Sequence, residues 1–261
     1  MKWVNCEGLA AFDCEPDHRD REPGLSAMFR IHNEEAWIEA ALDSVLPWVD
    51  EAVVVLNLCT DQTAAIVSRV LLRSRPGAVR VFHYPFKLHP MGPGHDECPA
   101  DSVLACAYYY NFAQAKTTRT HVVKWDGDMV AMDFFGTEVR RLLAKGVDRI
   151  KFEGRDLVGD DLRHIGCHPR CPTNGVYKVR EGVHYAQGPM TQSLRGVDEP
   201  SYVIERPAFV HMKWARKSFA SATVQWPENW QEIPHFASIA ERRHPVAPYE
   251  GEYPEAVAAL L

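Results

Sequence analysis

The chain has 261 residues, of which 46% are hydrophobic and 25% are charged, the composition of an ordinary globular protein. Its formal net charge of −6, from 29 Lys and Arg against 35 Asp and Glu, gives no reason to expect nucleic acid as a partner. No apolar run approaches the roughly 18–20 residues that cross a bilayer, so no transmembrane segment is expected. The N-terminus carries acids where a signal peptide has an apolar region, which predicts a cytoplasmic location, with peripheral membrane attachment left open.

Seven cysteines are present, an odd number that favours free thiols over a disulfide framework. Cys167 and Cys171 flank His168 in GCHPRCP, which suggests a zinc site. This CxxxC spacing has no matching second pair, however, so loop thiols and a solvated histidine are the favoured interpretation.

Hydrophobic periodicity divides the chain into alternating strands and helices after a polar lead-in. Strands are expected at residues 25–31, 51–58, 78–86, 121–131 and 147–159. Helices are expected between them at residues 32–45, 59–74, 103–117 and 133–146. This order is typical of parallel βαβ units with right-handed crossovers. After residue 160 the pattern loosens into loops with short strands, so the sequence predicts an α/β fold with an irregular second half.

Polar clusters lie at the ends of three predicted strands, at residues 32–35, 57–61 and 126–128. Ligands of open α/β sheets bind beyond the carboxyl ends of the strands, where these clusters would converge. The third cluster, Asp126-Gly127-Asp128, holds two carboxylates that repel each other unless water or a cation screens them. The sequence therefore predicts a ligand site along this edge of the sheet.

Three segments carry four motifs in a recognisable order. They are SAMFRIHNEEAWIEAALDSVLPWVDEAVVVLNLCTDQT at 26–63, YNFAQAKTTRTHVVKWDGDMV at 110–130 and FVHMKW at 209–214. The first resembles the opening of the family 2 glycosyltransferases with a GT-A fold: an apolar strand, N-E, a helix, a strand and a T-D-x-T loop. The second resembles the R-N-x-A helix and D-x-D strand of that family, and the third its late histidine segment near the metal.

The resemblance implies a GT-A-type mixed, mainly parallel central sheet flanked by helices, with an irregular C-terminal acceptor region. It divides the chain into a lead-in at 1–24, a nucleotide-sugar-binding half at 25–135, an acceptor and metal half at 136–220 and a C-terminal wrap at 221–261. The implied activity moves a sugar from a nucleotide-diphosphate sugar donor to a glycan or other hydroxyl acceptor, with inversion. Mn²⁺ or Mg²⁺ is the implied cofactor, because both accept carboxylate and phosphate oxygens.

The resemblance also implies roles for single residues. Asp128 and His211 are implied as metal ligands, and neutral imidazole suits Mn²⁺ beside carboxylates. Asp126 would reach the ribose or a metal-bound water. The metal would neutralise charge that develops on the leaving diphosphate. The nucleotide-binding residues implied are Arg30, His32, Asn33, Glu34, Asn57, Asp61, Asn111 and Asp126.

The sequence departs from the family at four places, one of which is Leu58-Cys59, where serine or glycine is usual in the loop. Leu56 stands where the second strand commonly ends in an aspartate that holds the nucleobase or ribose, so base preference is expected to depend little on that strand end. The substitution Leu56→Asp is then expected to change the preference for the nucleobase. Tyr110 replaces the arginine that usually precedes the helix asparagine, and Tyr185 replaces the acid of a V-H-E segment.

The loss of that acid leaves the catalytic base open. An inverting transfer needs a carboxylate or imidazole to deprotonate the acceptor hydroxyl. His184, Glu181 and Asp156 are the candidates, with the acidic pair 198–199 as a runner-up.

Plainer interpretations accompany these assignments. Asp126-Gly127-Asp128 also fits a polar turn, Asn33 and Asp61 fit helix N-caps, and Asn111 fits a surface position on its helix. His184 and His211 also fit histidines with structural hydrogen bonds. A nucleotidyltransferase is disfavoured because RIHNEEAW has no glycine after the first strand. The remaining alternative is a catalytically degenerate protein that binds a sugar nucleotide or glycan.

Overall fold

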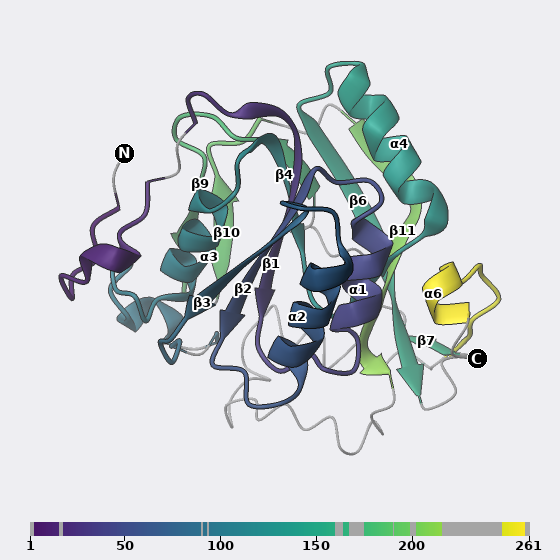
Figure 1. Ribbon diagram of the computed structural model, residues 1–261, viewed down its shortest axis with the longest axis horizontal. Coiled ribbons are helices and arrows are strands. Elements are labelled where there is room, and N and C mark those ends of the chain that lie inside the picture. Colours follow the sequence, from purple (N-terminus) through teal and green to yellow (C-terminus); the bar gives the residue numbers. More distant parts are fainter. Residues whose placement is uncertain are drawn as a thin grey trace.

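The computed structural model describes residues 3–15, 18–89, 91–92, 94–159, 164–166, 175–189, 191–198, 202–215 and 247–258 (Figure 1). Its helices are α1 Ile38–Val45, α2 Thr63–Arg73, α3 Cys106–Ala115, α4 Asp133–Ala144 and α6 Glu255–Ala258, with short 3-10 turns at Ala10–Phe12 and His95–Glu97. Its strands are β1 Glu22–Ile31, β2 Glu51–Asn57, β3 Val79–Tyr84, β4 Arg119–Trp125, β5 Met129–Ala131, β6 Arg149–Gly159, β7 His164–Gly166, β8 Gly175–Lys178, β9 His184–Gln187, β10 Gln192–Arg195, β11 Tyr202–Ala215 and β12 Ala247–Pro248. The zinc motif considered at 167–171 lies outside the described residues.

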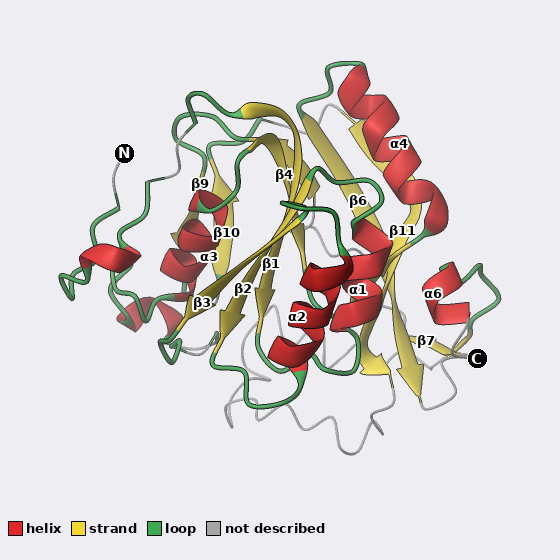
Figure 2. Cartoon of the chain, viewed as in Figure 1, coloured by secondary structure: helices red, strands yellow, loops and turns green. Residues whose placement is uncertain are grey.

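The sheet is mixed and carries helices beside it (Figure 2). Within the described ranges it has ten strands, in the order β12-β7-β6-β8-β4-β1-β2-β3, with β11 pairing both β5 and β6. The neighbours β4, β1, β2 and β3 are parallel, as are β6 and β11, whereas β8 lies antiparallel between β4 and β6. The predicted mixed, mainly parallel sheet flanked by helices is therefore confirmed. No helix in the described ranges is long and apolar enough to cross a membrane.

Apolar side chains of the central strands alternate between two packed layers. On β1 and β2, Phe29 and Val54 pack in the layer that includes side chains of α1, α2 and α4. Their neighbours Met28 and Val55 pack in the opposite layer, which includes side chains of α3. Successive residues of a strand point to opposite faces, so a strand buried on both faces has a nearly continuous apolar sequence. This burial fixes the strands whose carboxyl ends carry the candidate site.

The first helix begins later than the sequence predicted. α1 starts at Ile38, its N-cap residue is Trp37, and no side chain caps it. The interpretation of Asn33 as the N-cap of this helix is therefore wrong. Asn33 instead has a left-handed backbone with φ of +54°, a conformation that asparagine adopts more readily than most residues.

The second helix shows a smaller shift. α2 starts at Thr63 with Gln62 as its N-cap residue, one position after the predicted cap. Asp61 still satisfies the helix start, because its Oδ1 accepts a hydrogen bond from the Thr63 N–H at 3.0 Å.

The sequence suggests an apolar strand around His211 but only short strands after residue 160, and β11 is longer than this expectation. It runs parallel to β6 for 14 residues, and its register shifts between Ile204 and Phe209. Pro207 lies within that shift. Proline cannot donate to a ladder and normally argues against a continuous strand, so the irregular register accounts for the missed prediction.

Candidate active site

The turn at residues 126–128 meets β6 and β11 at one place. It lies between β4 and β5, directly after the carboxyl end of β4. In β11, His211 is opposite Met129 in the ladder with β5 and opposite Asp156 in the ladder with β6. The Met212 N–H also donates to the Asp128 carbonyl at 2.7 Å. The backbone register therefore brings together side chains that are far apart in the sequence.

His211 bridges two carboxylates. Its Nε2 lies 3.2 Å from Asp128 Oδ1, and its Nδ1 donates to Asp156 Oδ1 at 2.7 Å. Burial by itself would lower the pKa of His211, but the two carboxylates outweigh it and raise this pKa to about 10. The site therefore favours positive charge at the imidazole, whether a proton or a metal ion supplies it.

The Asp128–His211 pair fits one divalent cation. Two ligands about 2.1 Å from an ion and at right angles to each other lie about 3.0 Å apart, close to the 3.2 Å between Nε2 and Oδ1. Carboxylate oxygen and imidazole nitrogen are both ligands of Mn²⁺. In the described part of the chain, no group of three His, Cys, Asp or Glu side chains forms a metal cluster. Phosphate and water oxygens would complete the coordination, as they commonly do for Mg²⁺.

Asp126 is paired with two cations from neighbouring strands. Arg30 Nη2 donates to its Oδ1 at 2.5 Å, and Lys124 Nζ donates to its Oδ2 at 2.8 Å. Burial would raise the pKa of the Asp126 carboxyl, but Lys124 and Arg30 hold it well below its usual range. Asp126 is thus a fixed, ionised carboxylate whose side chain remains about one-third exposed, at 33%.

Gly127 allows the turn to approach the loop after β1. A Cβ at this position would lie 2.7 Å from Ile31 Cδ1 and 3.0 Å from Glu34 Cγ, closer than such atoms normally pack. Glu34 is held there because its N–H donates to Thr63 Oγ1 at 2.7 Å. The predicted nucleotide-binding residue Glu34 therefore packs against the aspartate turn.

The loops after β1 and β2 are joined by reciprocal hydrogen bonds. Asn33 Nδ2 donates to Thr60 Oγ1 at 3.0 Å, and the Thr60 N–H donates to Asn33 Oδ1 at 2.8 Å. Asp61 Oδ2 accepts from the Glu35 N–H at 3.1 Å, and Glu35 Oε2 accepts from the Gln62 N–H at 2.8 Å. Asn33 and Asp61 thus hold the loops together, and their nucleotide-binding roles stay predictions.

His32 and Asn57 connect these loops to the sheet. His32 Nδ1 donates to the Asn57 carbonyl at 2.6 Å, and Asn57 Nδ2 donates to the carbonyls of Tyr84 and Phe86, each at 2.8 Å. Leu58 follows with φ of +47°, a left-handed conformation that is uncommon for leucine. Unusual backbone of this kind persists where surrounding contacts fix it, as they do at this edge.

Leu56 does not face a ligand at the end of β2. Its side chain is 4% exposed and packs in the apolar layer with α1 and α2. In the sheet it lies between Ile31 of β1 and His83 of β3. A carboxylate at this position would be buried in the core, so Leu56→Asp reports on folding rather than on base preference.

The contacts described for Asn111 and His184 involve neither Asp128 nor His211. Asn111 is fully buried, which contradicts the surface interpretation, and its amide exchanges hydrogen bonds of 2.8 and 2.7 Å with the backbone of Tyr185. The His184 ring packs against Trp3, with centroids 5.4 Å apart, and its Nδ1 donates to the Gly182 carbonyl at 2.7 Å. The role of His184 as catalytic base stays a prediction that these contacts do not favour.

Lys124 and Tyr185 were missed as site residues. Lys124 lies two positions before Asp126, so the period of a strand puts both side chains on one face, and a lysine within HVVKW is the signal. Tyr185 packs edge-on against Tyr110, with ring centroids 4.9 Å apart, while Arg30 covers the Tyr110 ring. Burial raises the pKa of Tyr185, so its phenol is neutral.

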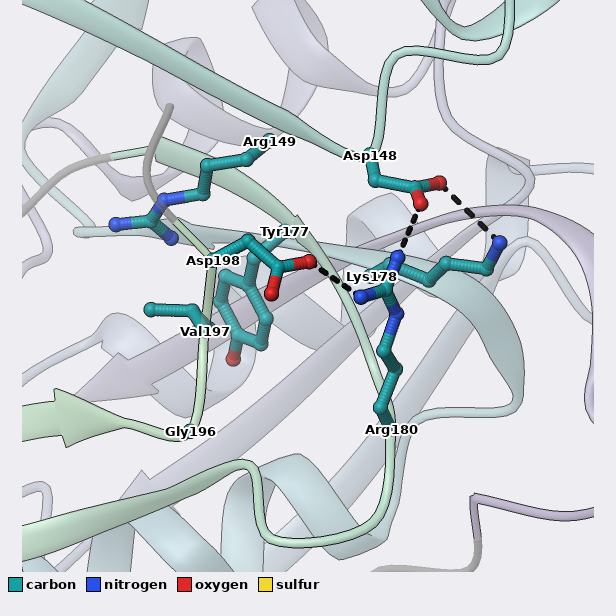
Figure 3. Close-up of a pocket in the computed structure, with 8 residues that line it drawn as sticks. All are labelled: Asp148, Arg149, Tyr177, Lys178, Arg180, Gly196, Val197 and Asp198. Atoms are coloured by element: carbon teal, nitrogen blue, oxygen red, sulfur yellow. Dashed lines mark hydrogen bonds and ion pairs between the residues drawn. The ribbon is translucent and has the colours of Figure 1, made fainter. Parts of the chain in front are cut away.

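A separate pocket lies near the amino end of β6 (Figure 3). Four of its five charged side chains pair with one another: Asp148 accepts from Lys178 Nζ at 3.2 Å, and Arg180 binds both Asp148 and Asp198. Lys178 is opposite His121 in the ladder of β8 with β4, near the start of β4. The pocket is therefore at the opposite end of the sheet from the aspartate turn, and its ion pairs connect the residue before β6 with β8, the turn after β8 and the segment after β10.

Among known proteins, the chain is similar in fold to solved structures. The sequence matches no protein-family model and no curated protein. Among solved structures it is similar to S. aureus TarS, with 15% identity and a TM-score of 0.51 over 72% of this chain and 36% of that chain. A structure of TarS residues 1–349 gives 14% identity and a TM-score of 0.49, over 72% and 60% of the two chains. Glucosyl-3-phosphoglycerate synthase from Mycobacterium tuberculosis, in complex with Mn²⁺, uridine-diphosphate and phosphoglyceric acid, gives 24% identity and a TM-score of 0.35, over 51% and 43%.

These neighbours are GT-A-type glycosyltransferases. The likeness to TarS, with the mixed sheet described above, shows that this chain has the fold of a GT-A glycosyltransferase. The chain spans 60% or less of the length of these neighbours. At such low identity the likeness establishes the fold alone, and activity must be argued from the site.

Proposed function

We propose that this protein is a family 2-like glycosyltransferase that moves a sugar from a nucleotide-diphosphate sugar to a hydroxyl acceptor, with inversion and with Mn²⁺ or Mg²⁺. The observation that carries the proposal is the Asp128–His211 pair, 3.2 Å apart, beside the carboxyl end of β4 in a GT-A sheet. A cation-binding pair at this edge suits a donor that brings two phosphates.

Asp128 and His211 would hold the metal. When bound, a divalent cation neutralises charge that develops on the leaving nucleoside diphosphate. Asp126 offers a fixed acceptor oxygen for a ribose hydroxyl or a water molecule. Arg30 and Lys124 keep the Asp126 carboxylate ionised and in place.

We assign the nucleoside to the loops after β1 and β2, at residues 32–35 and 57–63. Their reciprocal hydrogen bonds make this surface rigid before a ligand arrives, which lowers the entropy cost of binding. The acceptor would approach from the half at 136–220, whose strands β6 and β11 bring Asp156 and His211 beside the aspartate turn.

Binding without turnover is the second candidate function. Tyr185 stands where the resembled enzymes carry an acid, and its hydroxyl lies 3.3 Å from that of Tyr177. Because burial keeps this phenol neutral, it does not replace a carboxylate base. A chain with the donor site but no base would bind a sugar nucleotide and leave it intact.

Thermal unfolding with UDP, GDP, ADP and CDP, each with and without Mn²⁺, tests the donor site. We expect one diphosphate to raise the unfolding temperature of the wild type only when Mn²⁺ is present, and Asp128→Asn to abolish that rise. Asp43→Asn, on the exposed face of α1, is the matched control. Slow release of free sugar from the corresponding nucleotide sugar identifies an enzyme, and binding without release identifies the binding protein. No metal-dependent stabilisation by any diphosphate would reject both.

A further inference from the structure

We infer that Asp156 is a positioning residue for His211: it holds the Nδ1–H, so that Nε2 is presented to a divalent cation beside Asp128. This inference rests on the metal site of the proposed function and assigns the neighbouring carboxylate a role other than catalytic base. It follows from three features of the structure: the ladder register, the opposed ring nitrogens and the burial of the pair.

The ladder register fixes Asp156 next to His211. The two residues are opposite each other in the parallel ladder of β6 and β11. Side chains at such positions project to the same face of the sheet and interact directly. The resulting hydrogen bond from Nδ1 to Oδ1 is 2.7 Å, in the range of charge-assisted bonds.

The opposed ring nitrogens separate the roles of the two aspartates. Asp156 binds Nδ1, whereas Asp128 lies beside Nε2. A neutral imidazole has one N–H donor and one nitrogen lone pair. With the N–H held by Asp156, the lone pair is on Nε2, which is the nitrogen that faces Asp128. Carboxylates in this position fix the tautomer and ring orientation of metal-binding histidines and raise their basicity.

The same geometry argues against two other roles for Asp156. Its Oδ1 and a cation bound at Nε2 would lie on opposite sides of the imidazole ring, so this oxygen is poorly placed as a ligand of that cation. The Asp156 side chain is 15% exposed and already accepts the histidine proton, so it is also poorly placed as the base for an acceptor hydroxyl.

The test measures the binding of Mn²⁺ without nucleotide. The electron paramagnetic resonance signal of unbound Mn²⁺ is recorded, and it decreases as added protein binds the ion. We expect Asp156→Ala to weaken Mn²⁺ binding by about 10–100-fold, the usual cost of losing such a partner. Asp156→Asn keeps an oxygen that accepts the Nδ1–H and should recover most of the loss. Glu153→Gln removes the same charge from the same strand without this contact, and we expect it to bind Mn²⁺ like the wild type.

The variants separate failure of this inference from failure of the proposed function. If Asp128→Asn and His211→Ala lose Mn²⁺ but Asp156→Ala does not, the metal site stands and the positioning role is overturned. If Asp156→Asn loses as much affinity as Asp128→Asn, then Asp156 is itself a ligand and the inference is wrong. If Mn²⁺ behaves in the presence of the wild type as it does in buffer, or if Asp128→Asn binds Mn²⁺ like the wild type, the metal site of the proposed function fails first. Asp156→Asn keeps these outcomes decisive should Asp156→Ala not fold.

Discussion

The guanidinium of Arg30 lies over the ring of Tyr110, with Cζ 3.7 Å from the ring centroid, while its Nη2 donates to Asp126. A planar guanidinium can stack on an aromatic ring and still donate hydrogen bonds in its own plane. Tyr110 of α3 replaces an arginine of the resembled enzymes, and the guanidinium of Arg30 from β1 lies over its ring instead. The departure at Tyr110 thus leaves positive charge beside the first aspartate of the turn.

Removal of this cation should destabilise the fold as well as the site. Arg30 is 4% exposed, and Arg30→Met would leave the Asp126 carboxylate with Lys124 alone. We expect urea unfolding to show a loss of about 3 kcal/mol, the range for breaking a buried ion pair. Arg30→Lys keeps the charge but not the planar stacking, and should recover only part of this loss. Arg73→Met breaks an exposed pair with Asp43 and should cost about 1 kcal/mol or less; equal losses at positions 30 and 73 would contradict the assignment.

The aspartate turn should be sensitive to a single added methyl group. In Gly127→Ala, the Cβ would meet Ile31 Cδ1 and Glu34 Cγ at 2.7 and 3.0 Å, so the turn or its neighbours must move. We expect a loss of stability of about 1–3 kcal/mol, the usual cost of overpacking, and a larger relative loss of Mn²⁺ affinity because Asp128 shifts with the turn. Calorimetric titration and urea unfolding measure the two effects. Gly146→Ala, at a left-handed position with φ of +78° where an added Cβ meets nothing within 4 Å, costs backbone strain without crowding the turn and should leave Mn²⁺ binding unchanged; unchanged Mn²⁺ binding in Gly127→Ala would refute the expectation.

The fold was predictable from the sequence where burial on both faces gives continuous apolar strands, as in β2. The aspartate turn and His211 were predictable because each interrupts such a strand. The contacts of His184 and Leu56 were not, because the face that a side chain occupies at a strand end depends on register and on the neighbouring layers. The pairing of Asp156 with His211 depends on the register of β11 with β6, which shifts around Pro207 and was not predicted from the sequence.

Leu56 tests directly whether a side chain at the end of β2 faces the core or a ligand. Because its side chain is buried in the core, Leu56→Asp would place a carboxylate in an apolar layer. An unpaired buried charge is among the few causes of very large destabilisation, and we expect a loss above about 4 kcal/mol. Leu56→Met keeps the volume and should cost less than about 1.5 kcal/mol. A Leu56→Asp protein that unfolds in urea like the wild type, with altered diphosphate preference, would restore the view that this position faces the nucleobase.

Glu51 at the start of β2 should make stability depend on pH. Its side chain is 2% exposed and accepts hydrogen bonds from Ser26 Oγ at 2.7 Å, the Thr118 N–H at 2.5 Å and Arg80 Nη1 at 2.9 Å. Burial would raise the pKa of the Glu51 carboxyl, but these donors outweigh it and lower the pKa. A carboxyl whose pKa is lowered by folding contributes stability above its unfolded pKa of about 4.3, and this contribution is lost as the pH falls through the lower folded value.

Glu51→Gln removes the titrating group but keeps one acceptor oxygen, so it isolates this contribution. At pH 7 we expect the variant to be about 2 kcal/mol less stable than the wild type, since hydrogen bonds to a charged group are lost. The difference should shrink as the pH is lowered below about 4, because the wild type then loses the same charge on protonation. Urea unfolding of both proteins between pH 7 and pH 3 measures this convergence. As a control, Glu39→Gln removes an exposed carboxylate of α1 that pairs with Arg73, and its stability should follow that of the wild type at every pH. A constant difference between wild type and Glu51→Gln over this range would show that the buried carboxylate is not what couples stability to pH.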